Sequence, residues 1–292
     1  MFRLAFGTQY GLADPLAFAP GCEMVRSRQA ARHVHSLAAS RDGELVGSAF
    51  LSRWGSLAVF GPLTVDPDAW GLGIGSGLLD ASLELADDWG ADVGLFTLPE
   101  SAKHLHLYRK HGFWPGSLIA LTAKSISSSS APVEALGDLD ASGLAAAIEA
   151  CRAVTSAVRD GFDLTGEIES LVDPCAGGVV IERDDGRVAA FALCHVGAAS
   201  EAVTGSCYVK LAVVRPGPGG IAVLDKLLDA CETFAAERGA GRLEVGVNLE
   251  RRAAAELLDA RGHRTFRHGV AMHRPPGESP GSPGQLVLDD WR

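Results

Sequence analysis

Apolar and polar positions along the chain follow two rhythms, a period of two where a strand is predicted and a period near 3.6 where a helix is predicted. In the first half, Asp42 and Gly43 separate two strand-like runs, which indicates a β-hairpin. Gly90 and Gly112 end two helical runs. The predicted elements of this half are strands at residues 33–39, 44–54 and 56–65, a helix at 77–89, a strand at 92–97, a helix at 102–111 and a strand at 113–123.

The second half repeats this order of elements. Its predicted elements are strands at residues 179–183, 187–196 and 207–214, a helix at 221–238, a strand at 243–247, a helix at 251–260 and a strand at 269–273. The repeat has a period of roughly 140 residues and lies in the order of elements, not in close sequence similarity. The chain is therefore predicted to be an α/β protein with two tandem domains of the same kind.

A serine-rich segment separates the two halves. Residues 124–133 read KSISSSSAPV, and this run interrupts two stretches of strong periodicity. A second weakly patterned run at 275–283, rich in Pro, Gly and Ser, precedes a short alternating stretch. The predicted boundaries are residues 1–125 for the first domain, 126–134 for the linker, 135–275 for the second domain and 276–292 for a C-terminal tail.

Composition narrows the class of protein. A chain of 292 residues with 47% hydrophobic and 21% charged residues can bury two cores. The net charge of -10, without a block of Lys and Arg, argues against a nucleic-acid partner. We find no signal peptide and no apolar run of the ~20 residues that a membrane span needs. The sequence therefore predicts a soluble, cytoplasmic protein with no membrane partner.

The six cysteines do not suggest a metal site. They form no CxxC pair, and no histidine cluster has the spacing of metal ligands. We interpret them as buried, reduced thiols and predict no bound metal.

A glycine-rich loop is the sharpest chemical signal. Residues 63–79 read LTVDPDAWGLGIGSGLL, in which a strand ends near Pro67 and a helix begins at about Ser76. Such a loop presents backbone N–H groups where the helix dipole is positive, which suits a pyrophosphate. A P-loop would need a lysine here. The dinucleotide fingerprint fails at its third glycine, because Ser76 or Leu78 stands there.

The loop resembles the cofactor motif of the GNAT N-acyltransferase family, V-x-P-x-x-[Q/R]-x-x-G-x-[G/A]. The matching residues are Val65, Pro67, Gly73 and Gly75, and Trp70 replaces the usual Gln or Arg. The family's second motif, N-x-x-A-x-x-L-Y-x-x-x-G-F, follows at the family's spacing. The matching residues are Leu107, Tyr108, Gly112 and Phe113, with Ser101 and His104 at the Asn and Ala positions. The resemblance covers residues 33–123.

The resemblance implies a mixed sheet that splays between the parallel strands 56–65 and 92–97, and acetyl-CoA or another acyl-CoA as cofactor. The pantetheine arm would pair with backbone groups of Leu63, Thr64 and Val65. The pyrophosphate would lie on the loop of Gly71, Leu72, Gly73, Ile74, Gly75 and Ser76. Ser101 would be a further cofactor contact, or alternatively a plain helix N-cap.

For the chemistry, the resemblance implies acyl transfer to a primary amine, of a small molecule or a peptide, by direct attack. Tyr108 matches the general acid that protonates the leaving thiolate; a packed helix aromatic is the alternative. Residues 60–65 contain no carboxylate where the family often has a glutamate base, so a water or a group from the second domain would serve. We interpret His104, His106 and His111 as solvent-facing helix residues and Trp70 as a loop packing residue.

The second half resembles a degenerate GNAT domain. Pro218 removes an N–H donor from its shorter loop at 214–220, and Leu258 stands at the tyrosine position. We expect a structural or substrate-shaping role, with weak cofactor binding as the alternative. Asp163 and Glu167 are candidates to contact a cationic amine, or else belong to a solvated capping stretch.

A GNAT domain normally opens with a strand and a longer helix that the first half does not show, so either this copy lacks its first strand or the given start is internal to a longer chain. A missing edge strand would expose backbone groups and favour pairing with the tail at 285–292, or with another subunit in a homodimer. Two other functional classes stay open: a non-catalytic acyl-CoA-binding module and a structural protein that binds no ligand. A dinucleotide enzyme is a distant further alternative.

Overall fold

The computed structural model describes residues 1–126, 130–275 and 285–292. Parts of the predicted linker and tail, at 127–129 and 276–284, lie outside the described residues. The described helices are α1 (Phe2–Gln9), α2 (Met24–Ala30), α3 (Ile74–Asp88), α4 (Ala102–Lys110), α5 (Ala141–Val158), α6 (Thr165–Ser170), α7 (Gly220–Glu237) and α8 (Arg252–Ala260), with 3-10 turns at Pro15–Ala17, Pro67–Ala69 and Leu136–Asp138.

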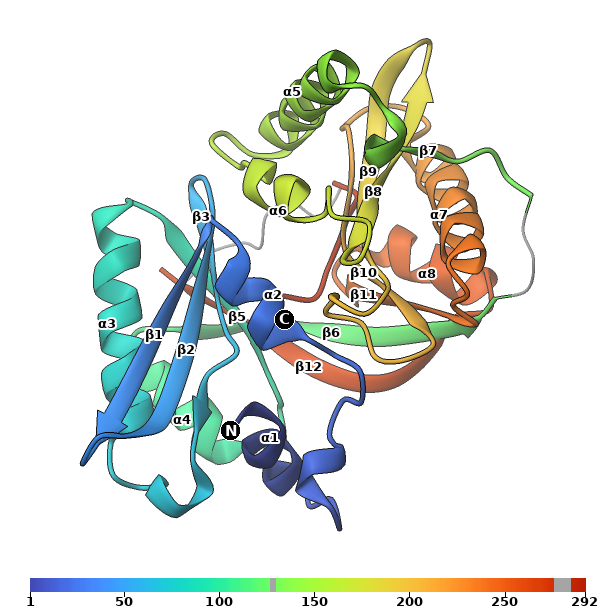
Figure 1. The fold of residues 1–292 in the computed structure, drawn as a ribbon. Coiled ribbons are helices and arrows are strands. Elements are labelled where there is room, and N and C mark those ends of the chain that lie inside the picture. Colours follow the sequence, from blue (N-terminus) through green and yellow to red (C-terminus); the bar gives the residue numbers. More distant parts are fainter. Residues whose placement is uncertain (127–129, 276–284) are drawn as a thin grey trace.

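The described strands join in one mixed sheet that runs through both halves (Figure 1). Their order is β1 (Val34–Arg41), β2 (Glu44–Trp54), β3 (Leu57–Phe60), β5 (Asp92–Thr97), β12 (Arg264–Arg274), β6 (Trp114–Ser125), β11 (Arg242–Asn248), β10 (Ser206–Val214), β9 (Arg187–His195), β8 (Gly177–Asp184) and β7 (Glu134–Ala135). Two short strands lie off this path: β4 (Thr64–Val65) pairs with β2, and β13 (Val287–Asp289) pairs with β10.

The two halves exchange their last strands. β12, from the second half, lies between β5 and β6, and β6, from the first half, lies between β12 and β11. Ile119 of β6 is opposite Gly269 of β12 on one side and Asn248 of β11 on the other. The strand predicted at 269–273, the last of the second half, therefore pairs with β5 of the first half. Alternation along a strand fixes which face is buried but not which strand is its neighbour.

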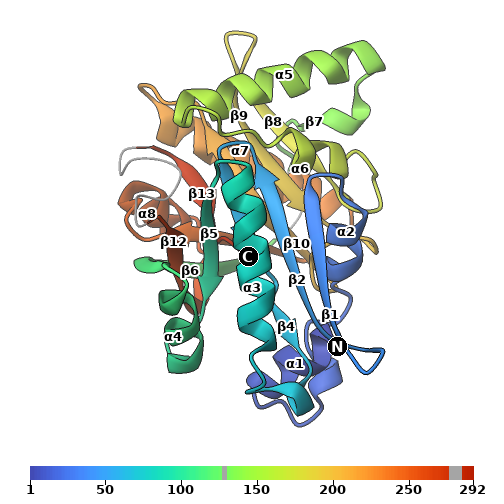
Figure 2. The ribbon, with the colours of Figure 1, turned by 90° about the vertical axis from the view of Figure 1, so that its left-hand side faces the viewer.

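Helices cover both faces of the sheet. α3 lies along the strands of the first half in Figure 2 and packs on β1, β2 and β5. In the second half, α5 and α7 lie on opposite faces, because alternate residues of β9 face different cores. Phe191 and Leu193 belong to the core that includes α5, whereas Ala190 and Ala192 belong to the core that includes α7. The predicted mixed sheet flanked by helices is confirmed, and the domain boundaries stay a prediction.

The tail does not complete the edge of the first half. Among the described residues, β1 pairs with β2 alone, so its outer edge is open, and pairing there in a homodimer stays a prediction. The tail instead forms β13 and pairs with β10, deep in the second half.

A buried ionic cluster (Arg28, Glu167, Glu201 and Lys210) lies where the halves meet. The Lys210 Nζ atom is 2.9 Å from Glu167 Oε2 and 3.1 Å from Glu201 Oε1, and Arg28 donates two hydrogen bonds to Glu201. Burial works to raise the pKa of the Glu167 carboxyl, but the Lys210 ammonium and the His33 ring hold that pKa well below its ordinary value. The cluster therefore stays ionised in the core and joins β10 to α2 and α6.

The exchanged strand β6 offers a matched test of this architecture. Ile119 is fully buried, whereas its neighbour Leu118 is 48% exposed. We expect Ile119→Ala to lower the free energy of unfolding by about 2–5 kcal/mol, because it leaves a cavity in the shared core. We expect Leu118→Ala to change it by less than about 0.5 kcal/mol. Urea unfolding measured by circular dichroism checks both values, and equal effects would contradict the strand placement.

Candidate functional site

The sheet of the first half opens between β4 and β5. β3 pairs in parallel with β5 only at Leu57, Ala58 and Val59. Beyond this point the chain turns away from β5 but stays beside β2, where Val65 of β4 lies opposite Gly47. The strand predicted at 56–65 is thus interrupted after Phe60, since residues 61–63 belong to no described strand, although the Gly61 N–H still donates to the Phe50 carbonyl oxygen of β2 at 2.8 Å. The predicted splay between two parallel strands is present.

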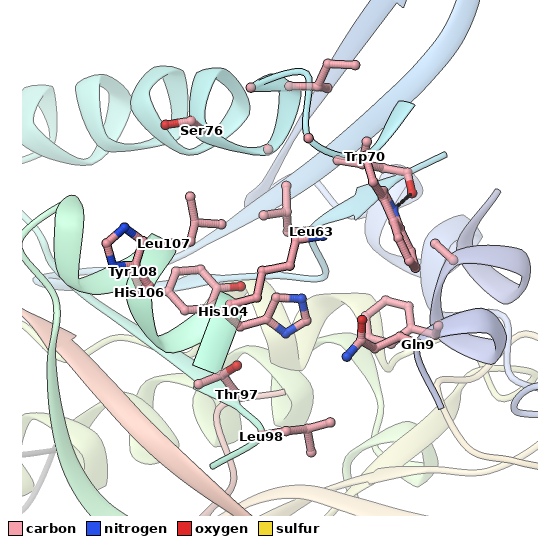
Figure 3. A pocket seen from close by; sticks show the side chains of 18 of the residues that line it. Gln9, Leu63, Trp70, Ser76, Thr97, Leu98, His104, His106, Leu107 and Tyr108 are labelled. Carbon is pink, nitrogen blue, oxygen red and sulfur yellow. Dashed lines mark hydrogen bonds between the residues drawn. The ribbon is translucent and has the colours of Figure 1, made fainter. Parts of the chain in front are cut away.

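A cavity of about 410 Å³ fills this opening (Figure 3). α1 covers one side, the glycine-rich loop and the start of α3 form another, and α4 and the end of β5 form the rest. Its lining side chains include Gln9, Tyr10, Leu63, Trp70, Ser76, Phe96, Thr97, Lys103, His104, Leu107 and Tyr108. Among the described residues that line it, none is Asp or Glu.

The glycine-rich loop has the backbone geometry of an anion site. Gly71 and Gly73 have φ values of 83° and 82°, which side chains other than glycine rarely adopt. Gly73 is the N-cap of α3, and no side chain caps this helix. The first-turn N–H groups of a helix have no partner within the helix, so they are free to meet an anion, and the helix dipole favours one there.

The start of α3 lies close to the splayed strand. A Cβ atom added at Gly75 would lie 3.7 Å from both Leu63 Cδ2 and Val65 Cγ2, which is ordinary van der Waals contact. Trp70 donates its ring N–H to the Val65 carbonyl oxygen at 2.9 Å, and Lys103 lies over its ring. Trp70 is thus a packing residue of the loop, as expected. It also occupies one backbone acceptor of the segment assigned to pantetheine.

The structure brings most of the predicted cofactor residues to this cavity. Those that line it are Leu63, Val65, Gly71, Gly73, Ile74, Gly75 and Ser76. Thr64 lies between two of them with its side chain buried, and Leu72 points into solvent. Ser101 is the N-cap of α4, where its hydroxyl accepts a hydrogen bond from the His104 N–H at 3.4 Å. The role of each residue toward a cofactor stays a prediction.

Tyr108 is both packed and directed into the cavity. It is 8% exposed, and its ring meets Phe60 and Phe113 edge to face. Figure 3 shows its hydroxyl turned into the cavity. Burial raises the pKa of Tyr108 far above its ordinary value, so the hydroxyl keeps its proton at neutral pH. The two interpretations of this residue are therefore compatible.

His104 also lines the cavity, one helical turn before Tyr108. The expectation that it faces solvent is wrong. Burial, together with the Lys103 charge, lowers the pKa of His104, so its imidazole is neutral at pH 7 and can accept a proton. Its spacing of four residues from Tyr108 was the sequence signal, since residues four apart share a helix face.

His111 differs from expectation as well. Its ring is largely buried, and its Nε2 atom lies 2.8 Å from Ser76 Oγ and 3.5 Å from Asp80 Oδ1. This contact ties the first turn of α3 to the end of α4. It thereby fixes the loop relative to Tyr108.

The second half does not supply the anticipated acidic contacts. Glu167 is buried and is taken up by Trp54, His33 and Lys210, so it belongs to the core and not to an acceptor site. Asp163 accepts a hydrogen bond from the Thr165 N–H at 2.8 Å. Leu258, at the tyrosine position, is fully buried.

Two properties of the described residues bear on other functions. No group of three or more His, Cys, Asp or Glu side chains in these parts of the chain could hold a metal ion. Within the same residues, every helix is too short or too polar to cross a membrane.

Comparison with known proteins agrees with this geometry. Residues 11–113 match the sequence model of the Acetyltransferase (GNAT) family. No curated protein matches the chain significantly in sequence. A putative acetyltransferase from Pyrococcus horikoshii is similar in fold, with a TM-score of 0.63 and 14% identity over 88% of this chain and 79% of that one.

Two further solved structures share the fold over most of the chain. A GCN5-related N-acetyltransferase from Sphaerobacter thermophilus has a TM-score of 0.53 and 20% identity over 85% of this chain and 84% of that one. A tandem GNAT protein from the clavulanic acid biosynthesis pathway has a TM-score of 0.57 and 14% identity over 95% and 94%. The family generally supports an acyl-CoA-dependent transferase role. Residues 11–113 thus carry the sequence signature of the GNAT acetyltransferase family, and the fold along most of the chain is similar to that of a tandem GNAT protein.

Proposed function

We propose that the chain transfers an acyl group, usually acetyl, from acyl-CoA to a primary amine that attacks the thioester carbonyl directly. One observation carries this proposal: the Tyr108 hydroxyl and the uncapped N-terminus of α3 open into the same cavity at the splay of the sheet. The residues present fit a polyanionic cofactor, because lysines and backbone N–H groups line the cavity and carboxylates are not among its described lining.

An acyl-CoA supplies the activated thioester and a thiolate leaving group. Tyr108 holds its proton in the neutral range and is placed to donate it as that group departs. His104 accepts a proton from the incoming amine, which attacks only in its neutral form. The pKa of His104 is lowered, so its imidazole is neutral and can act as the base. It takes the place of a carboxylate, which is not found among the described lining residues.

A binding module without catalysis is the second candidate, favoured by the lack of a carboxylate among the described lining residues. It would bind acyl-CoA but show only background thioester loss with any amine. A ligand-free structural protein would not bind acyl-CoA at all. The next two experiments separate these three classes.

Calorimetric titration with acetyl-CoA tests the cofactor site. We expect one saturable site, weakened by roughly a hundredfold in Gly73→Glu, because the new carboxylate opposes the pyrophosphate. Gly219→Glu is the matched control: Gly219 is the N-cap of α7, with a φ of 76° and open space around it, as for Gly73. Loss of binding in both variants, or binding in neither the variants nor the wild type, would count against the first-half site.

Substitution of Tyr108 tests the general acid. We expect Tyr108→Phe to lower kcat about a hundred- to ten-thousandfold while the Kd for acetyl-CoA changes little, because the ring packing is kept and only the proton donor is lost. Steady-state kinetics with an amine found by screening, together with calorimetry, gives both numbers. An unchanged kcat would remove Tyr108 from the mechanism.

The pH dependence tests His104. Because its pKa lies below the ordinary value of 6.5, the imidazole is neutral above that pH, so kcat/KM calculated on the concentration of the neutral amine should be flat there and fall as acidification protonates the imidazole. His104→Gln should lower kcat/KM and abolish this acidic limb, whereas the exposed His35→Gln should keep it. An acidic limb that survives in His104→Gln would assign the base elsewhere.

A further inference from the structure

The second half repeats the splay that forms the cavity in the first. β10 pairs in parallel with β11 only from Ser206 to Val209 and then continues without β11 to Val214. α7 follows, with Gly219 as an N-cap in the same left-handed conformation as Gly73 and again without a side-chain cap. The same opening is therefore built twice.

In the second half this opening is filled by the chain itself. β13 pairs antiparallel with the part of β10 that β11 has left: Leu211 is opposite Asp289, and Val213 is opposite Val287. The Val214 N–H donates to the Leu286 carbonyl oxygen at 3.0 Å. β13 thus takes the backbone groups of β10 beyond the splay.

The tail also reaches the other walls of the opening. Leu286 lies at the start of α7, where a Cβ atom added at Gly220 would be 2.9 Å from its Cδ1 atom. On the far side, Arg251, the N-cap of α8, donates to the Val287 carbonyl oxygen and to Asp289, both at 2.6 Å. These elements correspond to α3 and α4 around the cavity of the first half.

Burial shows that the tail is part of the core. Val287 is fully buried, and Leu288, Asp289, Asp290 and Trp291 are nearly so. Tyr208 donates its hydroxyl hydrogen to Asp290 at 2.8 Å. The segment therefore fills the opening with apolar and hydrogen-bonded contacts.

We propose that residues 285–292 are an internal peptide ligand of the second-half cleft, held there as an added β-strand in the place where a GNAT domain takes its cofactor. The cleft is consequently closed to acyl-CoA, and the chain carries one cofactor site. That acyl-CoA is the excluded ligand rests on the proposed function. The position of the tail in the second-half cleft does not depend on that function.

The end of the tail continues to residues of the first half. Trp291 packs on Trp54 and His273, with ring centroids 5.8 and 4.9 Å apart. Arg28 donates to the Arg292 carbonyl oxygen at 2.7 Å and to the Gly61 carbonyl oxygen at 2.6 Å. Gly61 stands where the first-half strand leaves β5, so the seated tail braces the opening that forms the cavity.

Engineered cysteines test the seating in the full chain. Val213 and Val287 are directly opposite in antiparallel register. Because the adjacent pair, Val214 and Leu286, is hydrogen-bonded, Val213 and Val287 form a non-hydrogen-bonded pair, in which a disulfide can form. We expect the double variant Val213→Cys and Val287→Cys to cross-link under mild oxidation, as seen by peptide mapping. The control Val213→Cys with Leu288→Cys, whose side chains lie on opposite faces of the sheet, should not. A folded chain without the first cross-link, or with both equally, would overturn the seating.

Calorimetry of the cross-linked chain tests the exclusion. We expect one acetyl-CoA per chain with unchanged affinity, and at least a hundredfold weaker binding when Gly73→Glu is added. Two acetyl-CoA molecules per wild-type chain, or binding at full affinity in the Gly73→Glu variant, would overturn the closed second cleft. If acetyl-CoA does not bind at all, the proposed function fails, while the cross-link still decides whether the tail is the ligand of its cleft.

Discussion

Strand β5 has β3 on one side, and its other edge needs a partner for its backbone N–H and C=O groups, which cannot be buried unpaired. β12 supplies that partner from the other end of the chain, and β6 does the same for β11. Each half therefore completes its sheet only with the last strand of the other. The position of β5, and with it one wall of the cavity, depends on residues 264–274.

This exchange explains why the halves share a core. Trp54 of the first half, Phe162 of the second and Trp291 of the tail belong to one buried cluster, and Ile119 and Leu121 of β6 lie in it too. Because residues of both halves bury their apolar side chains in this one cluster, the burial stabilises both halves at once. The ionic cluster around Lys210 adds charge pairs that are costly to disturb singly, so it fixes how α2 and α6 meet β10.

The opening in the sheet is a cavity in the first half and is filled by the tail in the second half. In the first half the strand turns away from β5 and leaves a cavity into which Tyr108 points. In the second half β13 pairs with the freed strand, and Leu258 replaces the tyrosine within a packed core. A cleft that exposes strand edges is stable only when something pairs with them or when water can enter, and the two halves use different solutions.

The sequence by itself determined the local elements and the chemistry of the loop. The spacing of Gly71, Gly73 and Gly75 after a strand predicted an anion site, and Leu107–Tyr108 before Gly112 placed the tyrosine on the next helix; both lie at one cavity. Their placement at one cavity could be inferred because helix period, glycine conformation and motif spacing are set within a few residues, whereas anion binding stays a prediction.

Tertiary structure alone decided the partners. The sequence did not reveal that strands 114–125 and 264–274 change places, that the tail enters the second cleft, that His104 lines the first cavity, or that Glu167 is buried. The alternating pattern of a strand is satisfied by any neighbour that covers its apolar face, and a charged side chain shows its burial only when distant partners such as Lys210 reach it. Pairing between distant segments depends on the whole fold, and no local pattern encodes it.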